Sequence, residues 1–187
     1  RQEILDDLVQ ESKRLDRTLH NILTLTAIEA GQVDPELEPL LIGTLIRQRV
    51  AEMAKRHPDR DFTVEVPPGL PMAEGSPEPL AHVLDNLYEN AAKYSPSGTP
   101  IHTRATADRA TIRISISDEG YGIAPENLPD VFERFRRPGA DPSVRGMGLG
   151  LYLSRHLMRA MHGSISVTSP GVGKGATFTI VLPTAAS

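Results

Sequence analysis

The chain has 187 residues and a net charge of −4 at pH 7, with 39% hydrophobic and 24% charged residues, the composition of a soluble globular protein. The negative charge argues against a general nucleic-acid-binding protein, and the absence of cysteine excludes disulfides and cysteine-ligated metals. No apolar run approaches the about 20 residues of a membrane-spanning helix. The sequence begins at Arg1 inside a helical pattern, so we expect a soluble piece of a longer protein.

Residues 1–31 are predicted to form one long amphipathic helix that ends at Gly31, shortly before Pro35. Its apolar seam follows spacings of three and four, as in coiled coils and helical bundles. The continuous polar outer face favours a seam in a bundle or dimer over a surface helix that packs on its own domain. The seam positions are Leu5, Leu8, Ser12, Leu15, Leu19, Ile22 and Thr26.

A second domain is predicted over residues 41–187, after a linker with two prolines at 32–40. Hydrophobic periodicity indicates both helices and strands in it, and we expect an α+β fold, a two-layer sandwich of a mixed sheet with helices on one face. Residues 118–147 are rich in Gly, Pro and Arg and are expected to be irregular. The predicted helices are 41–56, 76–94 and 148–162, and the predicted strands are 62–66, 101–107, 110–117, 164–169 and 176–182.

Asn86, Asn90 and Lys93 follow one another at helical spacing in the segment 86–94, so they share one face of the predicted helix. Two amide oxygens and an ammonium group on one stripe suit a hydrated magnesium ion that carries phosphates. The alternative is a polar helix face that is simply exposed to water.

Two glycine-containing segments suggest that the backbone approaches a ligand closely. Asp118 to Ile123 (DEGYGI) follows a strand, where a buried carboxylate can accept a hydrogen bond from an amine such as that of adenine; the alternative is a plain turn. Gly146, Gly148 and Gly150 run into a helix, whose first N–H groups can bind phosphate oxygens. The latter segment matches neither a P-loop nor the dinucleotide-binding G-x-G-x-x-G pattern.

Residues 132–137 (FERFRR) and the loop that follows them place several arginines between the two glycine-containing segments. A lid that closes over a triphosphate has this character. A solvated basic loop is the alternative.

In this order, the segments resemble the asparagine, first glycine, phenylalanine and second glycine boxes of the histidine kinase catalytic domain, and Gly173 to Phe178 resembles its final GTxF-like segment. The resemblance covers about residues 41–183. Residues 1–31, which end in LTAIEAG, resemble the second dimerisation helix of that family. We therefore assign residues 1–33 to the second helix of a dimerisation and phosphoacceptor hairpin, whose first helix is absent, and residues 41–187 to the ATP-binding catalytic domain. The resemblance implies a Bergerat-type sandwich that binds ATP and Mg²⁺.

The resemblance also implies a role for each motif residue. Asn90, with help from Asn86, would hold magnesium. The remaining assignments are Lys93 to phosphate, Tyr94 and Thr177 to the adenine end, Asp118 to the adenine amine with Gly120, Gly122 and Ile123 around it, Gly146, Gly148, Leu149 and Gly150 to the phosphates, and Arg137, then Arg134, to the γ-phosphate.

None of the six histidines is followed by the acidic residue that marks the family's phosphate acceptor. We therefore expect this chain to bind ATP without phosphorylating itself, because the nucleophile and its base are missing. The resemblance implies that the acceptor lies on the full-length protein's own helix, that a response regulator receives the phosphate, and that the chain forms a homodimer through its N-terminal helix. It also implies the cytoplasmic portion of a bacterial protein, whose parent can be membrane-anchored.

Two other functions remain open. An anti-sigma-type protein serine kinase would use the same fold, and a scaffold module would keep the helix seam but bind no nucleotide. Gyrase-type ATPases, which are related, carry a water-activating glutamate at the position of Asn86, and an asparagine cannot act as that base. We therefore expect slow hydrolysis, and transfer to a histidine when one is supplied.

Overall fold

The computed structural model describes residues 12, 18–19, 21–28, 30–31, 34–136 and 147–185. The chain divides into two compact units, Arg1–Asp34 and Pro35–Ser187. In the first unit, residues 18–19 and 21–28 are helical, and Leu19 and Ile22 of the predicted seam are exposed. Most of the predicted long helix lies outside the described residues.

A mixed sheet forms one layer of the second unit, with the strand order β2-β4-β5-β7-β6. β2 is parallel to β4, and the other neighbours are antiparallel. Two short strands, β1 and β3, form a separate antiparallel pair. The strands span Glu38–Leu40 (β1), Asp61–Glu65 (β2), Ala73–Gly75 (β3), Pro100–Ala107 (β4), Thr111–Asp118 (β5), Ser164–Thr168 (β6) and Ala176–Pro183 (β7).

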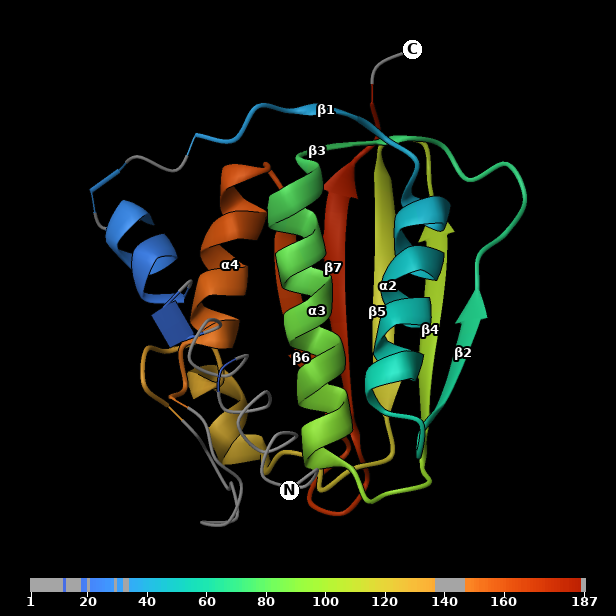
Figure 1. Cartoon of the computed structure of the whole chain (residues 1–187), viewed down its shortest axis with the longest axis vertical. Helices are drawn as coiled ribbons and strands as arrows, with labels where there is room; N and C mark the ends of the chain where they lie inside the picture. Colours follow the sequence, from blue (N-terminus) through green and yellow to red (C-terminus); the bar gives the residue numbers. More distant parts are fainter. Residues whose placement is uncertain are drawn as a thin grey trace. The chain divides into compact units, whose positions relative to one another are not determined.

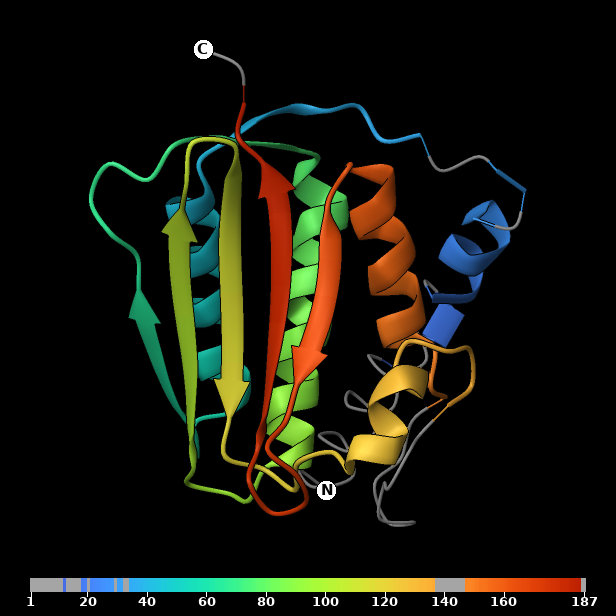
Figure 2. The same cartoon turned by 180° about the vertical axis from the view of Figure 1, so that it is seen from behind.

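Three helices cover one face of this sheet, α2 (Ile42–Arg56), α3 (Pro77–Tyr94) and α4 (Gly150–Ala160), as Figure 1 shows. Among the described residues of this unit, no helix covers the opposite face (Figure 2). Side chains alternate accordingly, because successive residues of a strand point to opposite faces. Ile112, Ile114 and Ile116 of β5 are buried under the helices, and so are Phe178 and Ile180 of β7. This arrangement confirms the predicted fold class.

The chemistry of their ends explains where α3 and α4 stop and start. Ser76 precedes α3 in an extended conformation, and Pro77 occupies the first turn, where a missing N–H does no harm. Ser76 occupies the cap position, but its side chain makes no capping hydrogen bond. α4 begins at Gly150, two residues later than predicted, because Gly148 has a φ of +68°, which no right-handed helix allows.

Ion pairs join α2 to the adjacent face of α3. Arg49 lies 3.5 Å from Asp85, and Arg56 lies 3.5 Å from Glu89. Asp85 and Glu89 are four residues apart, so this charged row is distinct from the one that carries Asn86 and Asn90. None of the helices in the described part of the chain is both long and apolar enough to cross a membrane.

Candidate functional site

The asparagine face of α3 meets the start of α4. The Asn86 amide nitrogen donates to Ser154 Oγ at 2.9 Å, and Ser154 is fully buried. The Asn86 Oδ1 atom lies against the Cα atom of Gly150, where any Cβ would collide with it. Because Gly150 opens α4, the Asn86 oxygen lies beside the first turn of that helix, whose backbone N–H groups have no intrahelical partner.

Asn90 and Lys93 continue this face toward the C-terminal end of α3 and are half-buried. Figure 1 shows that α4 begins part of the way along α3, so that the last turns of α3 extend past its start. The Lys93 ammonium group lies 5.0 Å from the centre of the Tyr94 ring. The fold thus brings an amide oxygen, a cation and a helix N-terminus to one end of the helical layer.

The end of β5 supplies a carboxylate at the same end of the molecule. Asp118 Oδ1 accepts the Gly120 N–H at 2.9 Å, and the Tyr94 carbonyl accepts the Tyr121 N–H at 2.9 Å. A Cβ at position 120 would collide with the Tyr94 carbonyl oxygen, so only glycine permits this approach. The loop after β5 is therefore attached to the last residue of α3.

The turn that precedes β7 holds the same loop from its other side. The Gly173 N–H donates to the Tyr121 carbonyl at 2.6 Å, and the Gly175 N–H donates to the Gly120 carbonyl at 3.0 Å. The Ile123 N–H donates to Ser169 Oγ at 3.0 Å. The glycine-rich connection between β6 and β7 thus supports the Asp118 loop.

Burial is the main influence on the ionisation of Asp118, and it raises the pKa of that carboxyl above its ordinary 3.8. Hydrogen bonds from the backbone N–H groups of Gly120 and Ala176 lower the pKa in part. A half-buried carboxylate with strong acceptor capacity can recognise an amine donor.

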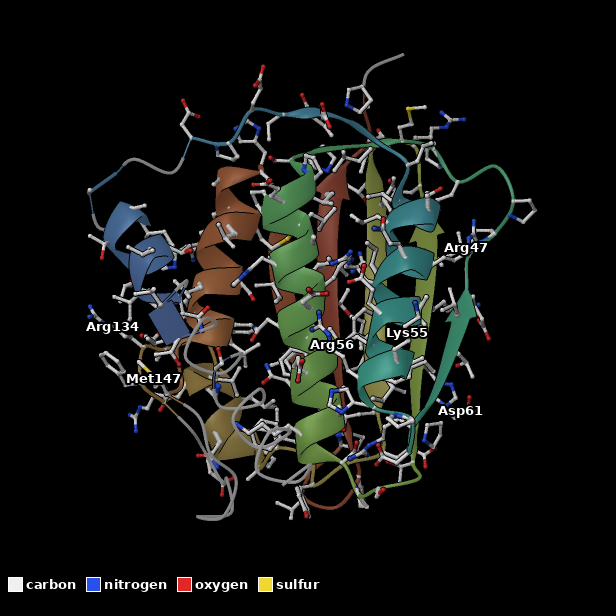
Figure 3. All side chains as sticks on the ribbon, viewed as in Figure 1. Arg47, Lys55, Arg56, Asp61, Arg134 and Met147 are labelled. Carbon is white, nitrogen blue, oxygen red and sulfur yellow. The ribbon has the colours of Figure 1, made fainter. Side chains whose placement is uncertain are left out.

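The two ends of the arginine-containing segment are joined to each other. The Phe135 N–H donates to the Gly148 carbonyl at 3.0 Å, and Figure 3 shows Arg134 and Met147 on the same side of the molecule. The Arg134 guanidinium stacks on the exposed Phe135 ring at 4.8 Å. Arg137 and Gly146, both predicted site residues, lie outside the described residues.

A second arginine fixes the start of this segment. Arg155 of α4 donates to Glu133 Oε1 at 3.2 Å and lies over the Phe132 ring at 5.9 Å. Phe132 in turn packs edge-on against Phe178 of β7. Residues 131–136 follow the 3₁₀ helix Pro125–Asp130, an element that the sequence did not predict.

Thr177 is not brought to this group. Its side chain lies on the helix-free face of the sheet, where its hydroxyl pairs with Ser117 Oγ at 2.9 Å. Its neighbour Ala176 is buried and pairs with Asp118 across the sheet, so the residue on the Asp118 side of β7 is one position earlier. Successive side chains of a strand point to opposite faces, so a shift of one residue changes the face.

The remaining predicted site residues also contribute to the packing of the fold. Gly122 has a φ of +64° and packs against the Gly171 carbonyl, and Leu149 is buried just before α4. Ser154 and Ser169 were not predicted from the sequence. Ser154 lies four residues after Gly150, so helical spacing alone could have placed it on the face toward Asn86; no local pattern marks Ser169.

The donor set suits a magnesium ion better than a softer metal. In the described ranges, no group of three His, Asp or Glu side chains is arranged to hold a metal. Asn86 uses its amide nitrogen on Ser154, which leaves the oxygen as the atom available to a ligand. Magnesium accepts such oxygens, keeps part of its water and takes its other ligands from phosphates.

Comparison with known proteins identifies the family of the chain. Residues 75–186 match the family described as histidine kinase-, DNA gyrase B- and HSP90-like ATPases. The sensor protein KdpD of Clostridium acetobutylicum is 29% identical over 98% of the chain and 20% of its own length. The adaptive-response sensory kinase SasA of Synechococcus elongatus is 33% identical over 96% of the chain and 47% of its own length.

The structure of full-length ShkA in complex with AMPPNP is 28% identical and superposes with a TM-score of 0.79, covering 93% of this chain and 37% of that one. The chain thus spans about a fifth of the length of KdpD and about half of the length of SasA.

Proposed function

Because the chain belongs to the family of histidine kinase-, DNA gyrase B- and HSP90-like ATPases, we propose that it is the ATP-binding catalytic region of a two-component sensor histidine kinase. It transfers the γ-phosphoryl group of ATP to a histidine outside these 187 residues. None of the six histidines of the chain is followed by an acidic residue, which supports an acceptor elsewhere. The resemblance to KdpD and SasA, both named as sensory proteins, supports the same assignment.

The observation that carries the proposal is the position of Asn86 against the first turn of α4, at the end of the layer where Asp118 closes β5. A nucleotide needs both ends of such a site. Its phosphates bind free N–H groups and cations, and its base binds a carboxylate that accepts an amine. In this chain Asp118 accepts the adenine amine, while Lys93 and the start of α4 bind phosphate oxygens.

Asn86 and Asn90 would hold the magnesium ion through their amide oxygens. When bound, magnesium neutralises charge on the β- and γ-phosphates. The residues of this chain orient the triphosphate so that its γ-phosphorus faces the incoming imidazole nitrogen. The bond to the β-γ bridging oxygen breaks as the P–N bond forms, and ADP leaves. Arg134 supplies positive charge near the γ-phosphate, and Arg137 is proposed for the same role.

Hydrolysis of ATP is a side reaction that this site does not favour. Asn86 stands where the related ATPases carry a glutamate, and an amide does not take a proton from water. On β7, we propose Ala176 and not Thr177 for the adenine contact. Ala176 lies on the same face of the sheet as Asp118, whereas Thr177 lies on the helix-free face.

The partners follow from the same assignment. The phosphate acceptor is a helix of the full-length protein, the next acceptor is a response regulator, and the N-terminal helix forms a homodimer. The site needs cytoplasmic ATP, so we place this region in the cytoplasm of a bacterial cell.

Calorimetric titration with ATP, with and without Mg²⁺, tests the nucleotide site directly. We expect magnesium-dependent binding that Asn90→Asp weakens, because an added carboxylate changes the charge around the ion and the phosphates. Unchanged affinity in that variant contradicts the assignment of Asn90. A chain that binds no ATP at all contradicts the proposed function and favours a scaffold.

Phosphotransfer to a supplied dimerisation hairpin with a histidine tests the reaction. We expect an acid-labile, alkali-stable phosphate on the hairpin and none on the isolated chain. The reverse stability identifies a serine kinase, and stable phosphohistidine on the chain alone contradicts an acceptor outside it.

A further inference from the structure

The carbonyl groups at the C-terminal end of α3 are not capped by a glycine. A helix leaves its last four carbonyl groups without helical partners, and many helices satisfy them with a glycine in a left-handed conformation. α3 instead ends at Tyr94 and is followed by Ser95, which is extended and precedes Pro96. The carbonyl groups of its last turn must therefore find donors elsewhere.

The Ser95 hydroxyl donates to the Ala91 carbonyl at 2.6 Å. Arg60, in the turn between α2 and β2, supplies the donor for one further carbonyl of the last turn and also binds the two residues that follow the helix. Its Nη2 atom donates to the Ala92 carbonyl at 2.6 Å and to the Ser95 carbonyl at 2.9 Å. Its Nη1 atom donates to Ser95 Oγ at 2.8 Å and to the Pro96 carbonyl. The side chain is only 9% exposed, so these bonds form largely out of water.

The guanidinium is itself held in place. Asp59 lies 3.4 Å from Arg60 Nε and accepts the Ser97 hydroxyl at 2.6 Å, while its backbone carbonyl accepts the Gly98 N–H at 3.1 Å. The two neighbouring residues thus bind the whole segment after α3. A cation at this place also interacts favourably with the negative end of the helix dipole.

The closed helix end leads directly into the nucleotide site. Tyr94 is the last residue of α3, and its carbonyl is the acceptor for the Tyr121 N–H that attaches the loop after Asp118. If the last turn frays, Tyr94 moves and this loop loses its attachment to α3. The orientation of Asp118 toward a base depends on that loop through its bond with Gly120.

We propose that Arg60 is a positioning residue for adenine recognition: it orders the last turn of α3 and so holds the Asp118 loop in its base-selecting position. The inference rests on the proposed nucleotide-binding function. In the frayed state the phosphates still bind, but without selection for the base. ATP therefore loses affinity, while GTP, which gains nothing from an acceptor opposite its carbonyl oxygen, changes little.

The test is calorimetric titration of wild type, Arg60→Ala and Arg60→Lys with ATP and with GTP, both in the presence of Mg²⁺. If the last turn is ordered in about a tenth of Arg60→Ala molecules, the Kd for ATP rises about tenfold. We expect the Kd for GTP to change less than about twofold, so that the ATP preference falls about fivefold or more. Lysine donates hydrogen bonds without the planar fork, and Arg60→Lys is expected to restore part of the preference.

Arg49→Ala is the matched control. Arg49 is an α2 arginine of similar burial, at 16% exposed, and it also bridges to α3, but at Asp85, away from the helix end. We expect Arg49→Ala to lower the urea midpoint of unfolding and to leave the ratio of GTP to ATP affinity unchanged. Partial unfolding would weaken the binding of both nucleotides equally.

An unchanged ratio in both Arg60 variants overturns the inference, as does an equal loss of ratio in Arg49→Ala. If Arg60→Ala does not fold, Arg60→Lys decides alone through its ratio. Absence of ATP binding in the wild-type chain overturns the proposed function and this inference together, whereas selective wild-type binding with an unchanged variant ratio overturns only the role of Arg60.

Discussion

Replacing Asp118 with asparagine changes one atom of the proposed base contact. Asp118 already accepts the Gly120 N–H through Oδ1, and its carboxylate also accepts the Ala176 N–H. In Asp118→Asn, the amide oxygen stays with a backbone donor and the NH₂ group faces the adenine amine. The variant therefore replaces an attraction between acceptor and donor with a repulsion between two donors.

The magnitude follows from the charge of the acceptor. A hydrogen bond to a charged group contributes about 1.5–3 kcal/mol, which is about 10- to 150-fold in Kd. We expect ATP affinity to fall within this range, and the affinity for GTP to fall less, since an NH₂ group can donate to the guanine carbonyl oxygen. Titration of ATP and GTP by calorimetry measures both, and an unchanged preference for ATP refutes the role of Asp118.

Asp85→Asn is the control, because burial raises the pKa of Asp85 as it does that of Asp118. Asp85 lies on the side of α3 that faces α2, away from the proposed nucleotide site. Both carboxyls have a cost of ionisation in the folded chain, so both substitutions remove a buried charge. Only Asp118→Asn should change the choice of base. A comparable change of base preference in Asp85→Asn would mean that the effect is transmitted through stability.

The raised pKa of Asp118 also predicts a dependence on pH. The folded chain holds this proton more tightly than the unfolded chain, so the contribution of Asp118 to the free energy of unfolding falls as pH rises from 3.8 through the folded-state pKa. The adenine amine binds the ionised form, so ATP affinity rises through the same acidic window and is level above it. A pH series with wild type and Asp118→Asn checks this, because the variant should lack the step.

The other predictions concern the packing around the site. In Gly150→Ala, the new Cβ displaces the Asn86 amide, whose end can move at little cost; we expect less than about 1 kcal/mol change in unfolding free energy by urea, but about tenfold weaker magnesium-dependent ATP binding. Gly173 and Gly175 share a positive φ, but only position 175 has no room for a Cβ; urea titration should show a loss of about 1–2 kcal/mol for Gly173→Ala and more for Gly175→Ala. Burial raises the pKa of Tyr88 to about 12; alkaline difference absorbance should show one tyrosine that ionises late, and Tyr88→Phe should remove it and cost about 1–2 kcal/mol by leaving a buried hydroxyl unpaired.

The sequence carried enough information to predict the layers and to place most of the proposed site residues on their helices and strands. Periodicity placed α2 and α3 nearly to the residue, because their buried side chains recur at helical spacing and Pro and Ser mark their ends. Asn86 and Asn90 were placed on one face by the same rule. β1 and β3 were not predicted, since each has three residues and offers no period to detect.

What the sequence could not provide are contacts between distant segments. Arg60 and Ser95 are separated by 35 residues, and nothing near Arg60 in the chain indicates a helix end as its partner. The position of Thr177 illustrates a different limit. A shift of one residue in a strand changes the face, and only the pairing of β5 with β7 shows that Thr177 lies on the face away from Asp118.

The glycines of the site explain why each motif by itself is weak evidence for a nucleotide site, whereas the motifs together are strong evidence. A side chain at Gly120 would strike the Tyr94 carbonyl, and one at Gly175 would strike the Asp118 carbonyl. Both are required by contacts within the protein, before any ligand binds. They hold three backbone segments, the end of α3, the end of β5 and the start of β7, close enough to present Asp118. A substitution at either glycine should therefore weaken nucleotide binding through the loop, with a matching loss of stability, whereas Asp118→Asn should separate the two effects.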